Sequence, residues 1–326
     1  MPGTDTSART STGTGTDSRT RAVTVTVGLD GSPESRAAAD WAAREARLFG
    51  LPLRLVHVRK PVPERMGWAS LAGGETQQRG AEQSGAEQMV REVAEGVRAR
   101  HSGLDVTTEQ VSGRPAEVLA RAAEGCELLV LGSRGLSGIG GFLVGSVGLS
   151  VVAHAERPVV LVRAGDRAAS EYEKGPAGRP SAATPFRPVV LGLDIEKPDE
   201  EVIAFAFAAA ARRATPLRVV HGWTPPAYHV YGLSLDLELH GNLARQGTSA
   251  LTEVLRPWCA KFPGVEVTAE SSYGTPGDHL ADASREASLV VVGRRIRRSA
   301  FGTHIGPVTH AVLHHSVAPV AVVPHD

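Results

Sequence analysis

The chain has 326 residues, of which 42% are hydrophobic and 21% charged, and its 35 Lys and Arg balance its 35 Asp and Glu. This length suffices for two domains of ordinary size, and the balanced charge argues against a global field that attracts nucleic acid or an anionic membrane. The two cysteines have neither metal-ligand nor disulfide-framework spacing, which favours a cytoplasmic protein.

The first 21 residues contain almost no apolar side chain. We therefore expect a disordered tail without a signal peptide, because such a segment cannot bury enough surface to offset the entropy of ordering it. No apolar run in the chain is long enough to span a bilayer, so we expect no membrane partner.

From residue 23 onward, strand and helix patterns alternate. Residues 23–29 form a β-branched run, and Ser32 followed by Pro33 is typical of a helix N-terminus, with Gly50 at the end of that helix. The further elements expected are strands at 53–58, 106–111, 128–131 and 159–162 and helices at 75–100, 115–123 and 145–155. Apolar strands alternating with helices predict a doubly wound parallel sheet covered on both faces.

The second half of the chain repeats the first. Residues 27–30 and 53–57 recur, with few changes, at 191–194 and 217–221. Later in the repeat, Gly132 corresponds to Gly293, Gly145 to Gly306 and His154 to His315, in one register. The predicted organisation is a tail at 1–21, a first domain at 22–164, a Gly- and Pro-rich linker at 165–186 and a second domain at 187–326.

Doubly wound sheets bind ligands beyond the carboxyl ends of their strands. Asp30, Val58, Gly113 and Gly132 all fall at predicted carboxyl ends. We therefore expect the chemistry of the first domain to gather at this edge.

A glycine-rich stretch runs from Gly132 to Val147, between a buried strand and a helix. Such a loop can present backbone N–H groups to phosphate, and glycine allows positive φ and close approach of a ligand, both of which we expect at Gly145. Ser146 adds a hydroxyl donor in the first helical turn. The other interpretation is that the glycines only shape a loop. A P-loop is excluded because no Gly-x-x-x-x-Gly-Lys-Ser/Thr occurs, and the dinucleotide fingerprint fails at Leu143.

The spacing of Gly132, Gly135, Gly145 and Ser146 resembles that of the ATP-binding subgroup of the universal stress proteins. Residues 27–32 and 157–162 also look like this family. The likeness covers two spans of the chain, residues 22–164 and 187–325. The resemblance implies two doubly wound parallel five-stranded α/β sheets of the adenine-nucleotide α-hydrolase type, one in each repeat. It also implies bound ATP, or ADP or AMP, and a regulatory role in stress response.

By this resemblance, Asp30 meets the ribose or phosphate end of the nucleotide, and Val58 contacts adenine through its backbone. Mg²⁺ can join Asp30 and the nucleotide phosphates, because magnesium often takes one or two carboxylates together with phosphate oxygens. The full set of residues expected at this site is Leu29, Asp30, Val58, Gly113, Leu131, Gly132, Arg134, Gly135, Gly145, Ser146 and Val147.

The second repeat departs from the pattern. Ile296 stands where the second glycine belongs, and Pro307 replaces the serine and lacks both hydroxyl and N–H. Arg294 opens a run of four arginines that would face phosphate, although a solvated basic loop on a decayed site is the other interpretation. The residues expected at this second, weaker site are Asp194, Gly293, Arg294 and Gly306.

Catalysis has little support in the sequence. No Gly-x-Ser-x-Gly elbow accompanies the serines near Asp30 and His57, and no P-loop lysine or evident water-activating base is present in the first repeat. We predict a nucleotide-binding protein, with a slow ATPase or adenylyl-transfer enzyme as the alternative and a module that binds nothing as a third class.

The fifth strands of the two repeats are short and apolar, and an unpaired apolar edge favours pairing with another edge. The resemblance implies the same arrangement, with the two fifth strands paired across a pseudo-twofold axis inside one chain. We therefore expect the two domains to pair with each other; a homodimer stays open, and the sequence does not name a protein partner.

Overall fold

The structure is a computed structural model that describes residues 23–59, 74–133, 144–164, 168–175, 183–224, 237–296 and 305–326. The tail expected at residues 1–21 lies outside the described residues, as do Arg134 and Gly135 of the glycine-rich stretch.

In the described part of the first half, strands and helices alternate as predicted, and each boundary lies within two residues of its expected place. The Ser32 hydroxyl caps the first helix by accepting a hydrogen bond from Ser35 N at 3.1 Å, and Gly50 ends that helix in the left-handed region at φ 66°. The elements are β1 (Val25–Leu29), α1 (Pro33–Phe49), β2 (Leu53–Arg59), α2 (Gly74–Arg100), β3 (Val106–Ser112), α3 (Pro115–Glu124), β4 (Leu128–Ser133), α4 (Ser146–His154) and β5 (Val159–Arg163).

The second half follows the same order, which confirms the duplication. Its first helix differs, because it begins at Glu200 with Asp199 as its N-cap, about one turn later than α1 begins in the matching register. The elements are β6 (Val189–Gly192), α5 (Glu200–Arg213), β7 (Leu217–Trp223), α7 (Leu237–Lys261), β8 (Val267–Tyr273), α8 (Pro276–Ala283), the short 3₁₀ helix η2 (Ser284–Glu286), β9 (Leu289–Arg295), α9 (Pro307–His315) and β10 (Val320–His325).

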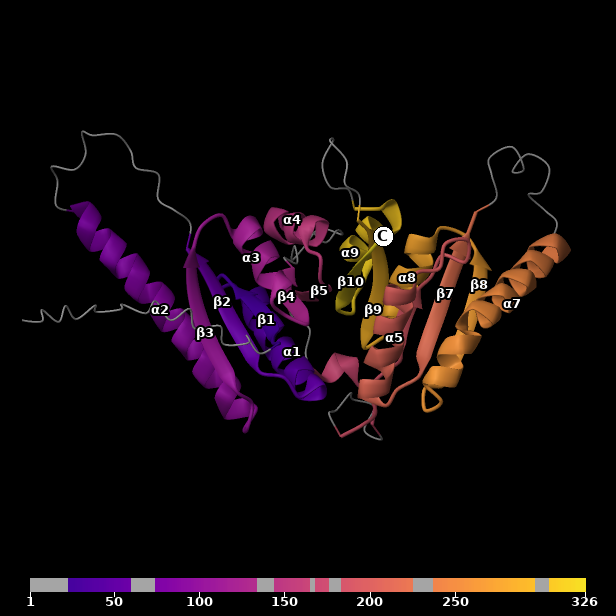
Figure 1. Cartoon of the computed structure of the whole chain (residues 1–326), viewed down its shortest axis with the longest axis horizontal. Helices are drawn as coiled ribbons and strands as arrows, with labels where there is room; N and C mark the ends of the chain where they lie inside the picture. The colour runs from indigo at the N-terminus through magenta and orange to yellow at the C-terminus, as the bar shows by residue number, and fades with distance from the viewer. Residues whose placement is uncertain are drawn as a thin grey trace, which may run out of the picture.

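The strands of both halves form one sheet in the order β3-β2-β1-β4-β5-β10-β9-β6-β7-β8 (Figure 1). Neighbours within each half are parallel, whereas β5 and β10 pair antiparallel at the centre, with Val160 opposite Ala321. The predicted pairing of the two fifth strands is therefore confirmed. The two five-stranded sheets expected from the resemblance are the halves of one continuous ten-stranded sheet.

Each face of this sheet carries its own hydrophobic core. Side chains of α1, α2, α5 and α7 pack on one face, where Trp41 and Phe207 are among the largest fully buried side chains. Side chains of α3, α4, α8 and α9 pack on the other face. The alternation of side chains along a strand explains the division, because Val160 and Val162 belong to the first core while Val159 and Leu161 belong to the second.

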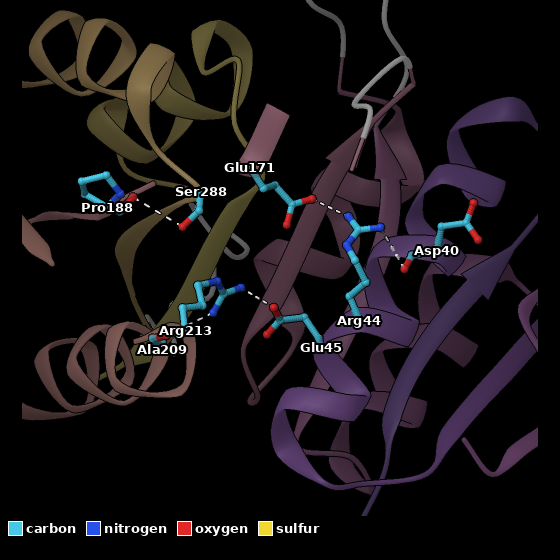
Figure 2. Close-up of polar contacts among 8 residues, drawn as sticks. All are labelled: Asp40, Arg44, Glu45, Glu171, Pro188, Ala209, Arg213 and Ser288. Carbon is cyan, nitrogen blue, oxygen red and sulfur yellow. Dashed lines mark hydrogen bonds and ion pairs between the residues drawn. The ribbon is translucent and has the colours of Figure 1, made fainter. Parts of the chain in front are cut away.

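Buried charges join the two halves beside the central strands (Figure 2). Arg213 of α5 forms an ion pair with Glu45 of α1, and the two side chains are 0% and 4% exposed. Arg213 also donates to the carbonyl oxygen of Ala209 at 3.3 Å. Separating the two side chains would leave a buried charge without its counterion, so the ion pair holds α1 in place against α5.

The predicted linker takes part in the same contact. Its 3₁₀ helix η1 (Ala168–Glu171) places the buried carboxylate of Glu171 against Arg44 of α1, as Figure 2 shows. After η1, the rings of Tyr172 and Phe186 stack with centroids 4.4 Å apart, and Arg187 N donates to Glu171 O at 2.9 Å. The described parts of the linker are therefore structured and contact the first half through Arg44.

Candidate functional site

The first half presents a carboxylate at the carboxyl edge of its strands. Asp30 directly follows β1 and is exposed, and its Oδ1 accepts hydrogen bonds from Ser32 N at 3.0 Å and from the Ser32 hydroxyl at 2.5 Å. The same hydroxyl caps α1. The first turn of a helix thus holds a negative charge in a defined place without burying it.

Gly132 lies where the N-terminus of α1 crosses the end of β4. A Cβ at this position would be 2.5 Å from the carbonyl carbon of Glu34 and 2.7 Å from Ser35 N, so only glycine permits this packing. β1 and β4 are parallel neighbours, with Val27 opposite Val130. Gly132 therefore allows the start of α1, which follows Asp30, to lie close to the end of β4.

The N-terminus of α4 is open at the same edge. Ser146 is its first residue and is exposed, and Val147 is 36% exposed. Gly145 is the N-cap, with φ −61° and ψ 151°, a conformation open to any residue. The expectation of a positive φ at Gly145 is therefore wrong.

Two further predicted residues lie at the ends of β2 and β3. Val58 is half-buried, and its register partner on β3 is Val111. Gly113 has φ 153°, its N–H donates to Arg59 O at 2.9 Å, and a Cβ there would be 2.7 Å from Val118 Cγ2. The backbone at Gly113 therefore requires glycine. Leu131, the last of the predicted residues within the described part, is buried near the end of β4.

Each half has a histidine close to its first-strand carboxylate. Burial lowers the pKa of His57 and that of His221, and the nearby Asp30 and Asp194 respectively act in the opposite direction. His221 Nδ1 lies 3.1 Å from the Ser271 hydroxyl oxygen. Both imidazoles therefore favour the neutral form at pH 7, in which they offer hydrogen bonds and no charge.

The second half contains a cavity of about 400 Å³ at its carboxyl edge. Asp194, Gly293 and Gly306, three residues of the predicted weaker site, all line it. The volume falls within the roughly 300–1,000 Å³ of small-molecule sites. Its walls come from the ends of β6, β7 and β9 and the starts of α8 and α9.

Arg294, the fourth predicted residue of the weaker site, lies elsewhere. Its side chain is buried, and its Nη2 donates to the carbonyl oxygen of Ala155 at the end of α4, in the other half. Pairing with β10 extends β9 as far as Arg295, so the two arginines point to opposite faces. Arg295 lines the cavity and Arg294 joins the halves, which corrects the sequence-based assignment.

Lys197, Asp199 and His325 also line this cavity and were not part of the site predicted from the sequence. Asp199 Oδ1 accepts from Glu201 N at 3.0 Å and from Val202 N at 3.2 Å, and its Oδ2 lies 3.3 Å from His325 Nδ1. The repeat alignment offered a signal, because Pro33, Ser35 and Ala164 occupy the matching places in the first half. Three charged or titratable groups therefore replace neutral residues.

The described residues show no metal centre of the usual kind. Among these residues, no group of three or more His, Cys, Asp or Glu side chains is arranged so that it could hold a metal ion. Burial raises the pKa of the Cys126 thiol to about 11, so this cysteine acts as a small buried hydrophobe. Within the same part of the chain, every helix is too short or too polar to cross a membrane.

Parallel strands covered by helices on both faces, with charged groups and helix starts at their carboxyl edge, define a doubly wound α/β domain, here present twice. The model of the universal stress protein family matches the chain over residues 23–163 and again over 185–324. The chain therefore belongs to the universal stress protein family, as a tandem of two such domains.

Known universal stress proteins match this chain over most of their own length. A universal stress protein of Mycolicibacterium smegmatis is 32% identical over 306 residues, which cover 91% of this chain and 95% of that protein. One from Mycobacterium tuberculosis is 32% identical over 315 residues, covering 92% and 95%. The crystal structure of a universal stress protein from Archaeoglobus fulgidus has the same fold, with a TM-score of 0.63, 19% identity and coverage of 93% of this chain and 98% of that one.

Proposed function

We propose that this protein binds an adenine nucleotide, ATP in the first instance, at the carboxyl edge of its first half, and that occupancy of this site serves regulation in stress response. The observation that carries the proposal is the meeting of three elements at one edge: the Asp30 carboxylate after β1, Gly132 at the end of β4 and the open start of α4 at Ser146. The glycine-rich stretch joins the last two.

The chemistry of these elements suits a nucleotide. The first N–H groups of a helix have no partner within it, and together with the helix dipole they favour phosphate at the start of α4. The Ser146 hydroxyl can donate a further hydrogen bond to a phosphate oxygen. Asp30, held by Ser32, can accept hydrogen bonds from ribose hydroxyls or share a Mg²⁺ ion with the phosphates.

The other predicted residues extend the site toward the base. In the proposed complex, the backbone at Val58 contacts adenine. Gly113 has no side chain, which leaves room for the adenine ring at the end of β3. Leu29 and Leu131 keep the floor of the site apolar and buried. Arg134, Gly135 and Val147 complete the proposed set around the phosphates.

The decisive experiment combines identification of the ligand with turnover. Purified full-length protein is heat-denatured to identify what it releases, and ATP binding and hydrolysis are then measured. We expect released adenine nucleotide and tight ATP binding without multiple turnovers. Sustained turnover would instead favour the slow ATPase or adenylyl-transfer alternative, and a protein that neither releases nor binds nucleotide would overturn the proposal.

A glycine substitution then locates the site. Gly145→Val should abolish ATP binding without unfolding the domain, because its φ accommodates valine while the branched side chain fills the space above α4. The matched control is Gly125→Val, at the end of α3, where a Cβ would have no neighbour within 4 Å. Equal affinity of the two folded variants in titration calorimetry would show that the site lies elsewhere.

A further inference from the structure

The antiparallel pairing at the centre of the sheet places opposite edges of the two halves side by side. Val159, which begins β5, lies opposite Val322 of β10, and β10 runs parallel to β9 as far as Arg295. The carboxyl end of β9 therefore lies near the amino end of β5. Helix α4 ends a few residues before β5 begins, so its C-terminus comes within reach of a long side chain from β9.

Arg294 of β9 makes this connection. Val292 belongs to the core that α4 and α9 cover, and Arg294, two residues further along the strand, points to the same face. Arg294 is only 4% exposed, and its Nη2 donates to the carbonyl oxygen of Ala155, the C-cap of α4. Ser133 occupies the matching place in β4, and a serine is too short for the same reach. This arginine is therefore a feature of the second half alone.

The end of α4 suits a buried cation. The last carbonyl groups of a helix have no partner within it, and they carry the negative end of the helix dipole. A guanidinium at this end satisfies a carbonyl oxygen and complements the dipole. Burial lowers the pKa of Arg294 and Glu156 raises it, and the guanidinium stays charged at pH 7. Arg294 is thus a C-terminal cap that the second half supplies to a helix of the first.

Helix α4 is short, so its position depends on what it contacts. It has nine residues, fewer than the roughly 12–15 that an isolated helix needs in water. Val144, before the helix, and Val151 and Val152, within it, are buried in the core of this face. Apolar contacts of this kind are non-directional, whereas a hydrogen bond at the helix end fixes where that end lies. Because a helix moves as a rigid unit, fixing its end also fixes its start at Ser146.

We propose that Arg294 is a positioning residue for the nucleotide site of the first half. By holding the C-terminus of α4, it sets the N-terminus of the same helix where its N–H groups meet phosphate. The second half thereby raises the ATP affinity of the first while contributing no atom to the ligand. This inference rests on the proposed function for the identity of the ligand.

The test replaces Arg294 with Met in the full-length chain, because methionine fills part of the same space and donates no hydrogen bond. In the chain without ligand, hydrogen exchange of the α4 amides should become about tenfold faster or more, as expected for losing a hydrogen bond from a charged group. ATP affinity, measured by calorimetry on the folded variant, should fall about threefold to tenfold at unchanged stoichiometry, because α4 is then in place in only part of the population.

Two further measurements separate positioning from a general loss of stability. Adenosine affinity, measured by competition with ATP, should not change in Arg294→Met, since adenosine has no phosphate to meet the start of α4. Arg294→Lys keeps a cation and a donor, so it should recover part of the ATP affinity and part of the protection of α4.

The matched control is Arg187→Met. Arg187 Nη1 donates to the carbonyl oxygen of Arg285 in η2 at 2.9 Å, so this variant removes the same kind of contact away from α4. It should leave both the exchange of α4 and the ATP affinity unchanged.

Three results would overturn the inference: equal α4 exchange in wild type and Arg294→Met, equal effects of Arg294→Met and the control, or ATP and adenosine affinities that change by the same factor. A wild type that binds no ATP would instead overturn the proposed function. The exchange of α4 in the chain without ligand would then still decide whether Arg294 positions this helix.

Discussion

The carboxyl edges of the two halves differ although their strands follow the same order. In the first half, the backbone of α1 at Glu34 lies so close to Gly132 that a Cβ there would be 2.5 Å away. In the second half, α5 begins about one turn later, and the His325 ring lies against Gly293, 2.7 Å from the place of a Cβ. Because α5 starts later, the place next to the glycine is filled by the His325 side chain in the second half and by the α1 backbone in the first.

This difference shows which parts of a duplicated domain are free to change. The strands share two buried cores, so their apolar pattern must be kept in both halves. The turns after the strands carry little of that core, and they can exchange Pro33 for Lys197 or Ser146 for Pro307 at small cost to folding. The chemistry of the two sites can therefore diverge while the sheet stays continuous.

The largest effect we expect is a loss of ATP binding when the first half is changed, with no loss when the matching position of the second half is changed. Gly145→Val should abolish ATP binding, because the loss of about two charge-assisted contacts to phosphate alone lowers the affinity by roughly two to four powers of ten. Gly306→Val, at the matching N-cap with nearly the same backbone angles, should leave ATP affinity and stoichiometry unchanged. Calorimetric titration of both variants measures this, and equal losses would mean that the two edges bind ATP alike.

A smaller effect tests whether the halves depend on each other. Arg213→Ala leaves the buried Glu45 carboxylate without its partner, which typically costs about 3–5 kcal/mol of unfolding free energy. The double variant Glu45→Leu with Arg213→Leu should recover much of that loss, because no buried charge remains. Arg256→Ala, which breaks an exposed ion pair with Glu253, is the control and should cost about 1 kcal/mol or less.

Urea unfolding, followed by signals from each half, provides the measurement. We expect Arg213→Ala to destabilise both halves together, since the pair joins α1 to α5. If only the second half lost stability, the two halves would fold as independent units and the ion pair would have no coupling role.

The linker carboxylate should give the next largest effect, through pH. Burial raises the pKa of Glu171 from 4.5 to about 7; Arg44 and Arg213 lower it and Glu45 raises it. The folded chain therefore keeps a proton between pH 4.5 and 7 that the unfolded chain loses, so this group's contribution to stability falls as pH rises through that window and is constant above it.

Glu171→Gln isolates this contribution, because the amide does not titrate. Relative to the variant, the wild type should lose about 3 kcal/mol of unfolding free energy between pH 4.5 and 7. Urea unfolding of both proteins at several pH values gives the difference. If the stability of the wild type relative to the variant stayed constant, or rose as the pH rises from 4.5 to 7, the Glu171 carboxyl would not be held in its neutral form.

Much of the fold could be read from the sequence because each signal was local or repeated. Ser32 and Pro33 mark the start of α1, Gly50 marks its end, and the second half repeats the whole order. Even the central pairing of β5 with β10 was predicted, from two short apolar strands that each have one edge without a partner in their own half and from the family resemblance. Helix caps and the spacing of apolar residues depend on neighbours in the chain, so they can be recognised without a structure.

The site of the second half was harder to predict from the sequence, because its residues come together only in the folded chain. His325 and Asp199 are far apart in sequence and come together through the pairing of β10 with β9 and the late start of α5. The roles of Arg294 and Arg295 depend on how far β9 extends, which pairing with β10 decides. Glu171 lay in a stretch with the composition of a linker, and only its contact with Arg44 shows that it is buried.

The smallest effects sharpen the comparison at the two helix caps. Ser32→Ala should cost about 1 kcal/mol of stability, as is typical of a lost N-cap, and should also weaken ATP binding because the Ser32 hydroxyl positions Asp30. Asp199→Ala should cost a similar amount of stability but leave ATP binding unchanged, since this cap belongs to the other half. Asp199→Asn, which keeps a capping oxygen, should cost only a few tenths of a kcal/mol. Thermal unfolding with and without ATP measures both quantities, and a loss of ATP binding in Asp199→Ala would mean that the first site is sensitive to the second edge through the shared sheet.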